Sequence, residues 1–155
     1  MRLALIIAGL AGAAMPASPA LATDTDDVIA LLAEMGHEVV EEAQSDGPNL
    51  VVDGRHWAIS LACTERRDCE FAWLYAPREV ALPVRTECAN DWNGQETFTT
   101  AWIDNLNQPW LTAAIDFVGD LGPAAIRGQI ERFEAQLPKF EAYIQTCVPI
   151  RKDDL

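Results

Sequence analysis

Two cysteines six residues apart, each at the end of an alternating segment, constrain the fold of this chain most. Large and small side chains alternate from Trp57 to Cys63, and large ones recur at every second position from Cys69 to Tyr75. This pattern predicts two antiparallel strands joined by the polar loop 64–68. Placing Cys63 opposite Cys69 brings the pair within disulfide reach. The same register pairs Leu61 with Phe71, Ile59 with Trp73, and Trp57 with Tyr75.

We therefore predict a Cys63–Cys69 disulfide that closes the hairpin. A redox or zinc pair is the alternative, but a five-residue gap matches neither C-x-x-C nor an ordinary zinc knuckle. The remaining pair, Cys88 and Cys147, would tie a middle helix to the end of the last helix. The spacing does not show whether these two cysteines meet, so this second disulfide stays open.

The N-terminus has the composition of a secretory signal peptide. Arg2 precedes the apolar run 3–14, and Ala20-Leu21-Ala22 forms an A-x-A cleavage site. We expect cleavage after residue 22, no membrane insertion of the mature chain, and a periplasmic location. The full chain carries a net charge of -13, and losing Arg2 makes it -14 (-13 minus 1). Such a charge repels nucleic acid, so we exclude nucleic-acid partners.

Periodicity along the mature chain predicts one α+β domain over 23–147, followed by a loose tail over 148–155. The expected helices span 23–36, 83–94 and 123–147, and the last has an apolar stripe running from Ile126 to Ile144. Strands are expected near 39–44 and 50–52, in the cysteine hairpin, and over 96–104 and 110–117. The predicted architecture is an antiparallel sheet built from hairpins with helices packed on it. Its element order is α-β-β-β-β-α-β-β-α.

Tryptophans provide much of the bulk that the predicted core needs. Trp92 shares a helical stripe with Val84 and Cys88, and the predicted hairpin register sets Trp102 opposite Leu111. We predict that the structural core includes Trp57, Trp73, Trp92 and Trp102.

Catalytic motifs are missing from the sequence, including G-x-S-x-G, H-E-x-x-H, the P-loop and the dinucleotide fingerprint. Neither His37 nor His56 has a sequence neighbour that marks it as a general base. An acid pair such as Asp91 with Glu96 can be proposed, but surface solvation explains the abundant carboxylates better. We predict no catalytic residue, no metal site and no cofactor.

The segment Asn90-Asp91-Trp92-Asn93, followed by an alternating strand, a short turn and a second strand, resembles the YbjN family. The resemblance extends over about 28–143 and includes the Asp53-Gly54 turn. This family is named for a role in bacterial sensory transduction. The resemblance implies a fold like that of the type III secretion chaperones, which are small, acidic, often dimeric proteins that bind protein segments.

We accordingly expect a non-enzymatic domain that binds a protein or peptide partner at a sheet edge or a helix–sheet groove. Asn90, Asp91 and Asn93 are the candidate binding residues, and a helix ending is the alternative explanation for them. A homodimer is a further expectation. The rival functions are a small periplasmic hydrolase that uses a carboxylate pair and an envelope-stress protein without a dedicated ligand.

Overall fold

A computed structural model describes residues 23–44, 47–80, 83–117 and 121–147. The predicted signal peptide (1–22) and tail (148–155) lie outside these residues. The α+β class and the order of the elements are those predicted. The elements are α1 (Thr25–Glu34), β1 (Val39–Gln44), β2 (Gly47–Val52), the short 3₁₀ turn η1 (Asp53–Arg55), β3 (Trp57–Thr64), β4 (Arg67–Pro77), α2 (Thr86–Gln95), β5 (Thr100–Ile103), β6 (Pro109–Asp116) and α3 (Pro123–Cys147).

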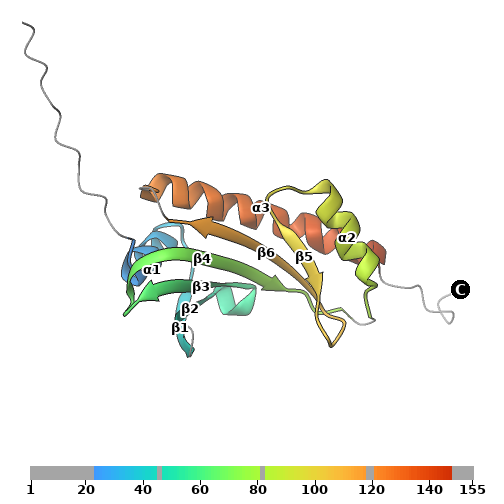
Figure 1. Ribbon diagram of the computed structural model, residues 1–155, viewed down its shortest axis with the longest axis horizontal. Helices are drawn as coiled ribbons and strands as arrows, with labels where there is room; N and C mark the ends of the chain where they lie inside the picture. Colours follow the sequence, from blue (N-terminus) through green and yellow to red (C-terminus); the bar gives the residue numbers. More distant parts are fainter. Residues whose placement is uncertain (1–22, 45–46, 81–82, 118–120, 148–155) are drawn as a thin grey trace, which may run out of the picture.

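The six strands form one antiparallel sheet in the order β1-β2-β3-β4-β6-β5. In Figure 1, α3 runs along the length of the sheet, with α1 towards one end of it and α2 towards the other. None of the helices in the described ranges has the length and apolar character needed to cross a membrane. We call the helix-covered face of the sheet the inner face and the opposite face the outer face.

The two terminal helices begin and end where their sequences predict. In α1, the backbone N–H of Asp24 donates to Asp27 at 3.2 Å, and Gly36 follows the helix with a φ of 93°. Helix α3 begins at Pro123 and buries one apolar stripe on the sheet. The fully buried centre of that stripe consists of Ile130, Phe133 and Phe140.

The pairing of β3 with β4 differs from the predicted register. Cys63 does lie opposite Cys69, but the register shifts by one residue on each side of this pair. Ser60 therefore pairs with Trp73, and Ile59 pairs with Leu74. Glu70, which has no partner position on β3 between the Cys63–Cys69 and Ala62–Phe71 pairs, causes this slip, and Asp68 is the extra residue on the turn side of the cysteine pair. As a result, β4 turns its alanines and Leu74 to the core and its aromatic residues outwards.

Two of the four predicted core tryptophans are consequently not in the core. Trp57 and Trp92 are buried as expected, whereas Trp73 is 46% exposed and Trp102 is 44% exposed. Trp102 faces outwards because the β5–β6 register is also one residue from the predicted one: Trp102 pairs with Trp110, and Ala101 pairs with Leu111.

The middle helix and its strand are shorter than predicted. Helix α2 begins at Thr86 rather than at Pro83, because Arg85 keeps an extended conformation as N-cap. Strand β5 begins only at Thr100 rather than at residue 96, and Thr99 is buried beneath α2, where its hydroxyl accepts a hydrogen bond from Trp92. Asp53 and Gly54 both have positive φ angles, and their turn belongs to a four-residue connection in which Val52 pairs with Trp57.

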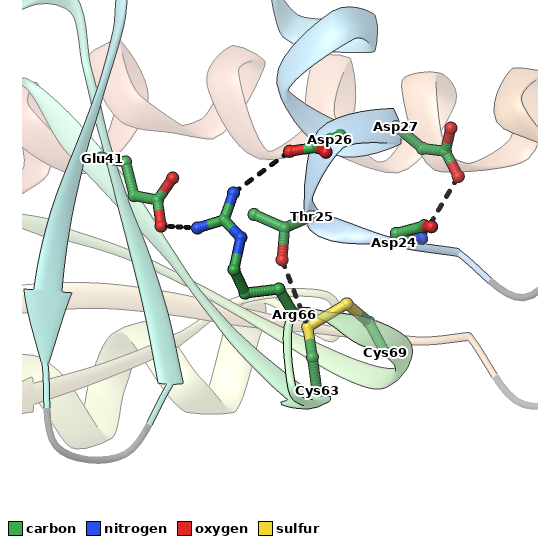
Figure 2. A network of polar contacts seen from close by, with 8 residues as sticks. All are labelled: Asp24, Thr25, Asp26, Asp27, Glu41, Cys63, Arg66 and Cys69. Atoms are coloured by element: carbon green, nitrogen blue, oxygen red, sulfur yellow. Dashed lines mark hydrogen bonds and ion pairs between the residues drawn. A yellow bond between two sulfur atoms is a disulfide. The ribbon is translucent and has the colours of Figure 1, made fainter.

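Both pairs of cysteines form disulfides, Cys63–Cys69 as predicted and Cys88–Cys147 where the sequence left the pairing open. Figure 2 shows the closed hairpin end packed against α1. Arg66 in its loop bonds to Asp26 of α1 at 3.1 Å and to Glu41 of β1. The cysteine hairpin therefore ties the first helix to the edge hairpin of the sheet.

Candidate functional site

Five aromatic side chains lie on the outer face, and together we call them the aromatic strip. The β4 residues project from the same face because they occupy alternate positions. Ring centroids lie 5.6 Å apart for Phe71 and Trp73, 6.0 Å for Tyr75 and Trp110, and 5.3 Å for the stacked pair Trp102 and Trp110. The strip consists of Phe71, Trp73, Tyr75, Trp110 and Trp102.

Small neighbours leave these rings accessible. On the β3 side, Ala62, Ser60 and Ala58 lie opposite Phe71, Trp73 and Tyr75 respectively. On the β6 side, Ala114 lies opposite Trp73. Short side chains on both sides cannot cover an indole ring, which explains why nearly half of Trp73 remains exposed. Exposed contiguous apolar area of this kind is typical of an interaction surface.

Polar groups fix the orientation of two rings in the strip. The Tyr75 hydroxyl donates to Oδ1 of the buried Asn49 at 2.6 Å. The Trp110 indole Nε1–H donates to Asp104 at 3.1 Å. The backbone N–H of Gln108 and this indole N–H lower the pKa of Asp104, so its carboxylate stays charged. These bonds fix the Tyr75 and Trp110 rings of the strip within the folded chain.

A pocket of about 170 Å³ lies beside the strip, and most of its lining is apolar. One carboxylate, Glu42, contributes to it. The lining residues are Glu42, Asn49, Val51, Trp57, Ala58, Tyr75, Pro77 and Trp110.

The three binding residues predicted from the sequence lie away from the strip, on α2. Asn90 and Asp91 are exposed on that helix. The Asn93 side chain instead donates to the Ala101 carbonyl at 2.9 Å and accepts from the Ala101 N–H at 2.7 Å. The Asn93 side chain thus pairs with both backbone groups of Ala101 at the edge of β5, as the backbone of a neighbouring strand would. This geometry supports the alternative explanation, a helix ending, for Asn93.

Replacing Asn93 with alanine is expected to lower the free energy of unfolding by about 1–2 kcal/mol, because both backbone groups of Ala101 lose their partner. Urea unfolding followed by circular dichroism measures this loss. The matched control is Asn90→Ala on the same helix, which should change stability by less than about 0.5 kcal/mol. Equal effects of the two substitutions would contradict the proposed role of Asn93.

His37 lies in a cluster of charged groups that the sequence did not reveal. Its Nδ1 lies 2.9 Å from Asp53 and its Nε2 lies 3.2 Å from Glu134. Asp53 follows β2 and Glu134 lies on α3, so only the folded chain brings them to His37. Burial raises the pKa of Glu134, and His37 partly offsets this rise. Both ring nitrogens are engaged by carboxylates, so the cluster joins α3 to the sheet.

Asp53 gives the cluster a pH dependence. Burial alone would raise the pKa of Asp53, but hydrogen bonds from His37 and the Glu38 N–H outweigh burial and lower this pKa. A lowered carboxyl pKa stabilises the fold above the unfolded value, near pH 4, and this stabilisation is lost as the pH falls through the folded value. We expect Asp53→Asn to cost about 1 kcal/mol at pH 7, since the group is partly exposed, and less at pH 3. Asparagine also tolerates the positive φ at this position.

Urea titrations of Asp53→Asn and the parent protein at pH 7 and pH 3 test this expectation. Asp91→Asn, which changes an exposed carboxylate of α2, is the control. A loss that is equal at both pH values would show that the Asp53 charge is not what stabilises the cluster.

The described residues contain no group of three or more His, Cys, Asp or Glu side chains suited to hold a metal ion. Of the acid pair considered from the sequence, Glu96 accepts a hydrogen bond from Gln136 at 3.4 Å, and Asp91 is exposed on α2.

The fold and the surface together define a class of protein, a small α+β domain with helices on one face of an antiparallel sheet and an aromatic surface on the other. The model of the YbjN family, described as "Putative bacterial sensory transduction regulator", matches residues 24–146. The chain belongs to the YbjN family. None of the curated proteins matches it.

Proposed function

We propose that this chain is an exported, non-enzymatic YbjN domain that binds a protein or peptide partner on the outer face of its sheet. The observation that carries the proposal is the aromatic strip, because exposed tryptophan and tyrosine side chains dominate the binding energy of protein interfaces. The regulatory description of the family supports a binding role rather than turnover.

Other docking modes have less support than the outer face. The edge at β5 is already bonded by Asn93. The space between α3 and the sheet is filled by fully buried side chains, including Phe133 and Phe140. The rival hydrolase would need a pocket with two carboxylates, but the pocket beside the strip has one, Glu42, in a mostly apolar lining.

Affinity capture from periplasmic extract tests the proposal, with the parent chain and two variants as baits. One variant is Trp73→Ala/Trp102→Ala, which removes exposed rings, and the matched variant is Asn90→Ala/Asp91→Ala on α2. We expect a partner near stoichiometric amounts that the tryptophan variant loses and the α2 variant keeps. A partner lost only with the α2 variant would overturn the outer-face site. Recovery of no partner by the parent chain would overturn the binding role.

Export is part of the proposal and has its own support. Two disulfides favour an oxidising compartment, and 1–22 has the composition of a signal peptide. Cell fractionation followed by intact mass measurement should recover the chain in the periplasm with Thr23 as its first residue. Recovery of the uncleaved chain from the cytoplasm would overturn export.

A further inference from the structure

We infer that the aromatic strip recognises a basic segment of its partner, an extended stretch bearing arginine or lysine side chains. This inference rests on the proposed function and specifies the chemistry of the partner. It is argued from the ring faces of the strip, the charges around it, and an intramolecular contact that already uses the same interaction.

The strip offers the faces of indole rings, to which cations bind best. Arginine and lysine are attracted to the negative face of an aromatic ring, and tryptophan is the strongest of the three aromatic acceptors. Trp73 and Trp102 are each nearly half exposed. Trp102 and Trp110 stack with an interplanar angle of 13°, so the two rings together offer a cation a larger aromatic surface than one ring does. Along β4, the backbone positions that carry same-face rings recur every ~7 Å, which is also the spacing of alternate residues in an extended peptide.

The charges around the strip favour a cationic partner. Strand pairing places the strip in rows that run from Val40 and Glu42 on β1 to Thr100 and Trp102 on β5. The charged residues among the outward positions of these rows are Glu42 and Asp116, and Asp116 lies directly opposite Phe71. The whole chain carries a net charge of -13, which attracts a basic segment at long range.

The protein already uses the proposed interaction elsewhere. The guanidinium of Arg132 on α3 lies 4.2 Å from the centroid of the Phe98 ring. Within the described ranges, no cation of this chain covers Trp73 or Trp102 in the same way. Trp73 and Trp102 therefore present exposed indole faces to a cation from outside the chain.

The same charges argue against other occupants of the face. A second copy of the chain would place the acidic residues beside its strip against those beside the first strip. Each copy also has a net charge of -13, so the two copies repel each other. An anionic lipid surface would be repelled for the same reason. A basic peptide gains both from the rings and from the charges.

Peptide binding to the full chain tests the inference directly. One labelled twelve-residue peptide alternates arginine with serine. The matched peptide carries citrulline at each arginine position, so it keeps the shape and loses the charge. Fluorescence anisotropy at physiological salt should give binding that is at least about tenfold weaker for the citrulline peptide and for the variants Trp73→Ala and Trp102→Ala. The control Glu87→Gln, an exposed acid on α2, should bind the arginine peptide as the parent does.

Each outcome separates the inference from the proposed function. Equal affinity for the two peptides, both lost in the tryptophan variants, would overturn the cationic inference and leave the outer-face site standing. Arginine-peptide binding that survives both tryptophan substitutions would reveal general attraction to an acidic protein and overturn the inference. Absence of binding to either peptide up to millimolar concentration would also overturn it, while the capture experiment decides the proposed function.

A measurement without substitutions covers the case in which a tryptophan variant misfolds. The protein has five tryptophans, so its indole N–H groups give five resolvable NMR signals. The arginine peptide should shift the signals of Trp73 and Trp102 and leave those of the buried Trp57 and Trp92 in place. The reverse pattern, or no shift at any indole, would contradict binding at the strip.

Discussion

Replacing Trp92 with alanine is expected to lower the free energy of unfolding by about 3–5 kcal/mol, the range for large-to-small substitutions of buried aromatic residues. The Trp92 ring is 5% exposed and packs edge-on against Phe140 with centroids 5.0 Å apart. Its Nε1–H donates to the hydroxyl of Thr99 at 3.2 Å. The substitution therefore opens a cavity between α2 and α3 and leaves the buried Thr99 hydroxyl without this bond. Urea unfolding at pH 7 measures the loss.

Two further substitutions separate packing from hydrogen bonding. Trp92→Phe keeps most of the ring volume and loses the indole donor, so we expect a smaller loss of about 1–2 kcal/mol. Trp102→Ala removes a ring of the same type from the outer face, where we expect a cost of about 1 kcal/mol or less. If Trp92→Ala cost no more than Trp102→Ala, the interface between α2 and α3 would not be a core of the domain.

Trp92 is buried and Trp102 is exposed, although the sequence predicted both as core residues. The difference shows which parts of the fold the sequence pattern predicts. In α1, α3 and β3, only one face carries large apolar side chains. The spacing of these side chains therefore identified both the type of element and its buried side. Strand β4 has apolar residues on both faces: Ala72, Leu74 and Ala76 alternate with Phe71, Trp73 and Tyr75. Periodicity cannot choose between two apolar faces. The larger side chains favoured the wrong face in the prediction.

Local irregularity decided the orientation of β4. The Cys63–Cys69 pair was located correctly, but the unpaired residues beside it moved the rest of the strand by one position. One residue of slip exchanges the faces of a strand. The extra residue that moved the strand is Glu70, which is not among the positive-φ residues, so no glycine marks this bulge in the sequence. The strip itself was therefore missed, although each of its aromatic residues had been considered as a core or strand residue.

Contacts between distant segments were equally invisible in the sequence. His37 meets Asp53 and Glu134, which follow it by 16 and 97 positions, and neither spacing has a local pattern. Asn93, by contrast, was identified from the N-x-W-N motif, and the helix-ending explanation described its bonds to Ala101 better than the binding one. The N-x-W-N motif thus located Asn93, and the structure shows that its side chain bonds the edge of β5.

Removing the Cys88–Cys147 disulfide by a Cys88→Ala/Cys147→Ala double substitution is expected to destabilise the protein by about 4 kcal/mol. The bridge closes a separation of 59 residues, and a longer closed loop restricts the unfolded chain more. For a domain of this size, we expect the melting temperature to fall by about 10–15 °C. The bridge also anchors the surroundings of Trp92, since the Tyr143 hydroxyl donates to the Cys88 carbonyl at 3.1 Å and the Tyr143 ring packs on Trp92.

The Cys63→Ala/Cys69→Ala variant is the matched control, because it removes a bridge with a separation of six residues. The loop-closure argument assigns this bridge about 2 kcal/mol, roughly half the effect of the longer one. Calorimetry of both variants and the parent compares the two losses, and non-reducing peptide mapping of the parent should show both linked pairs. Free thiols at Cys88 and Cys147, or a larger loss from the short bridge, would contradict the assignment of the long bridge as the main covalent restraint. If instead the long bridge dominates, reduction should unfold the contact between α2 and α3 first, because the bridge ties α2 to the end of α3.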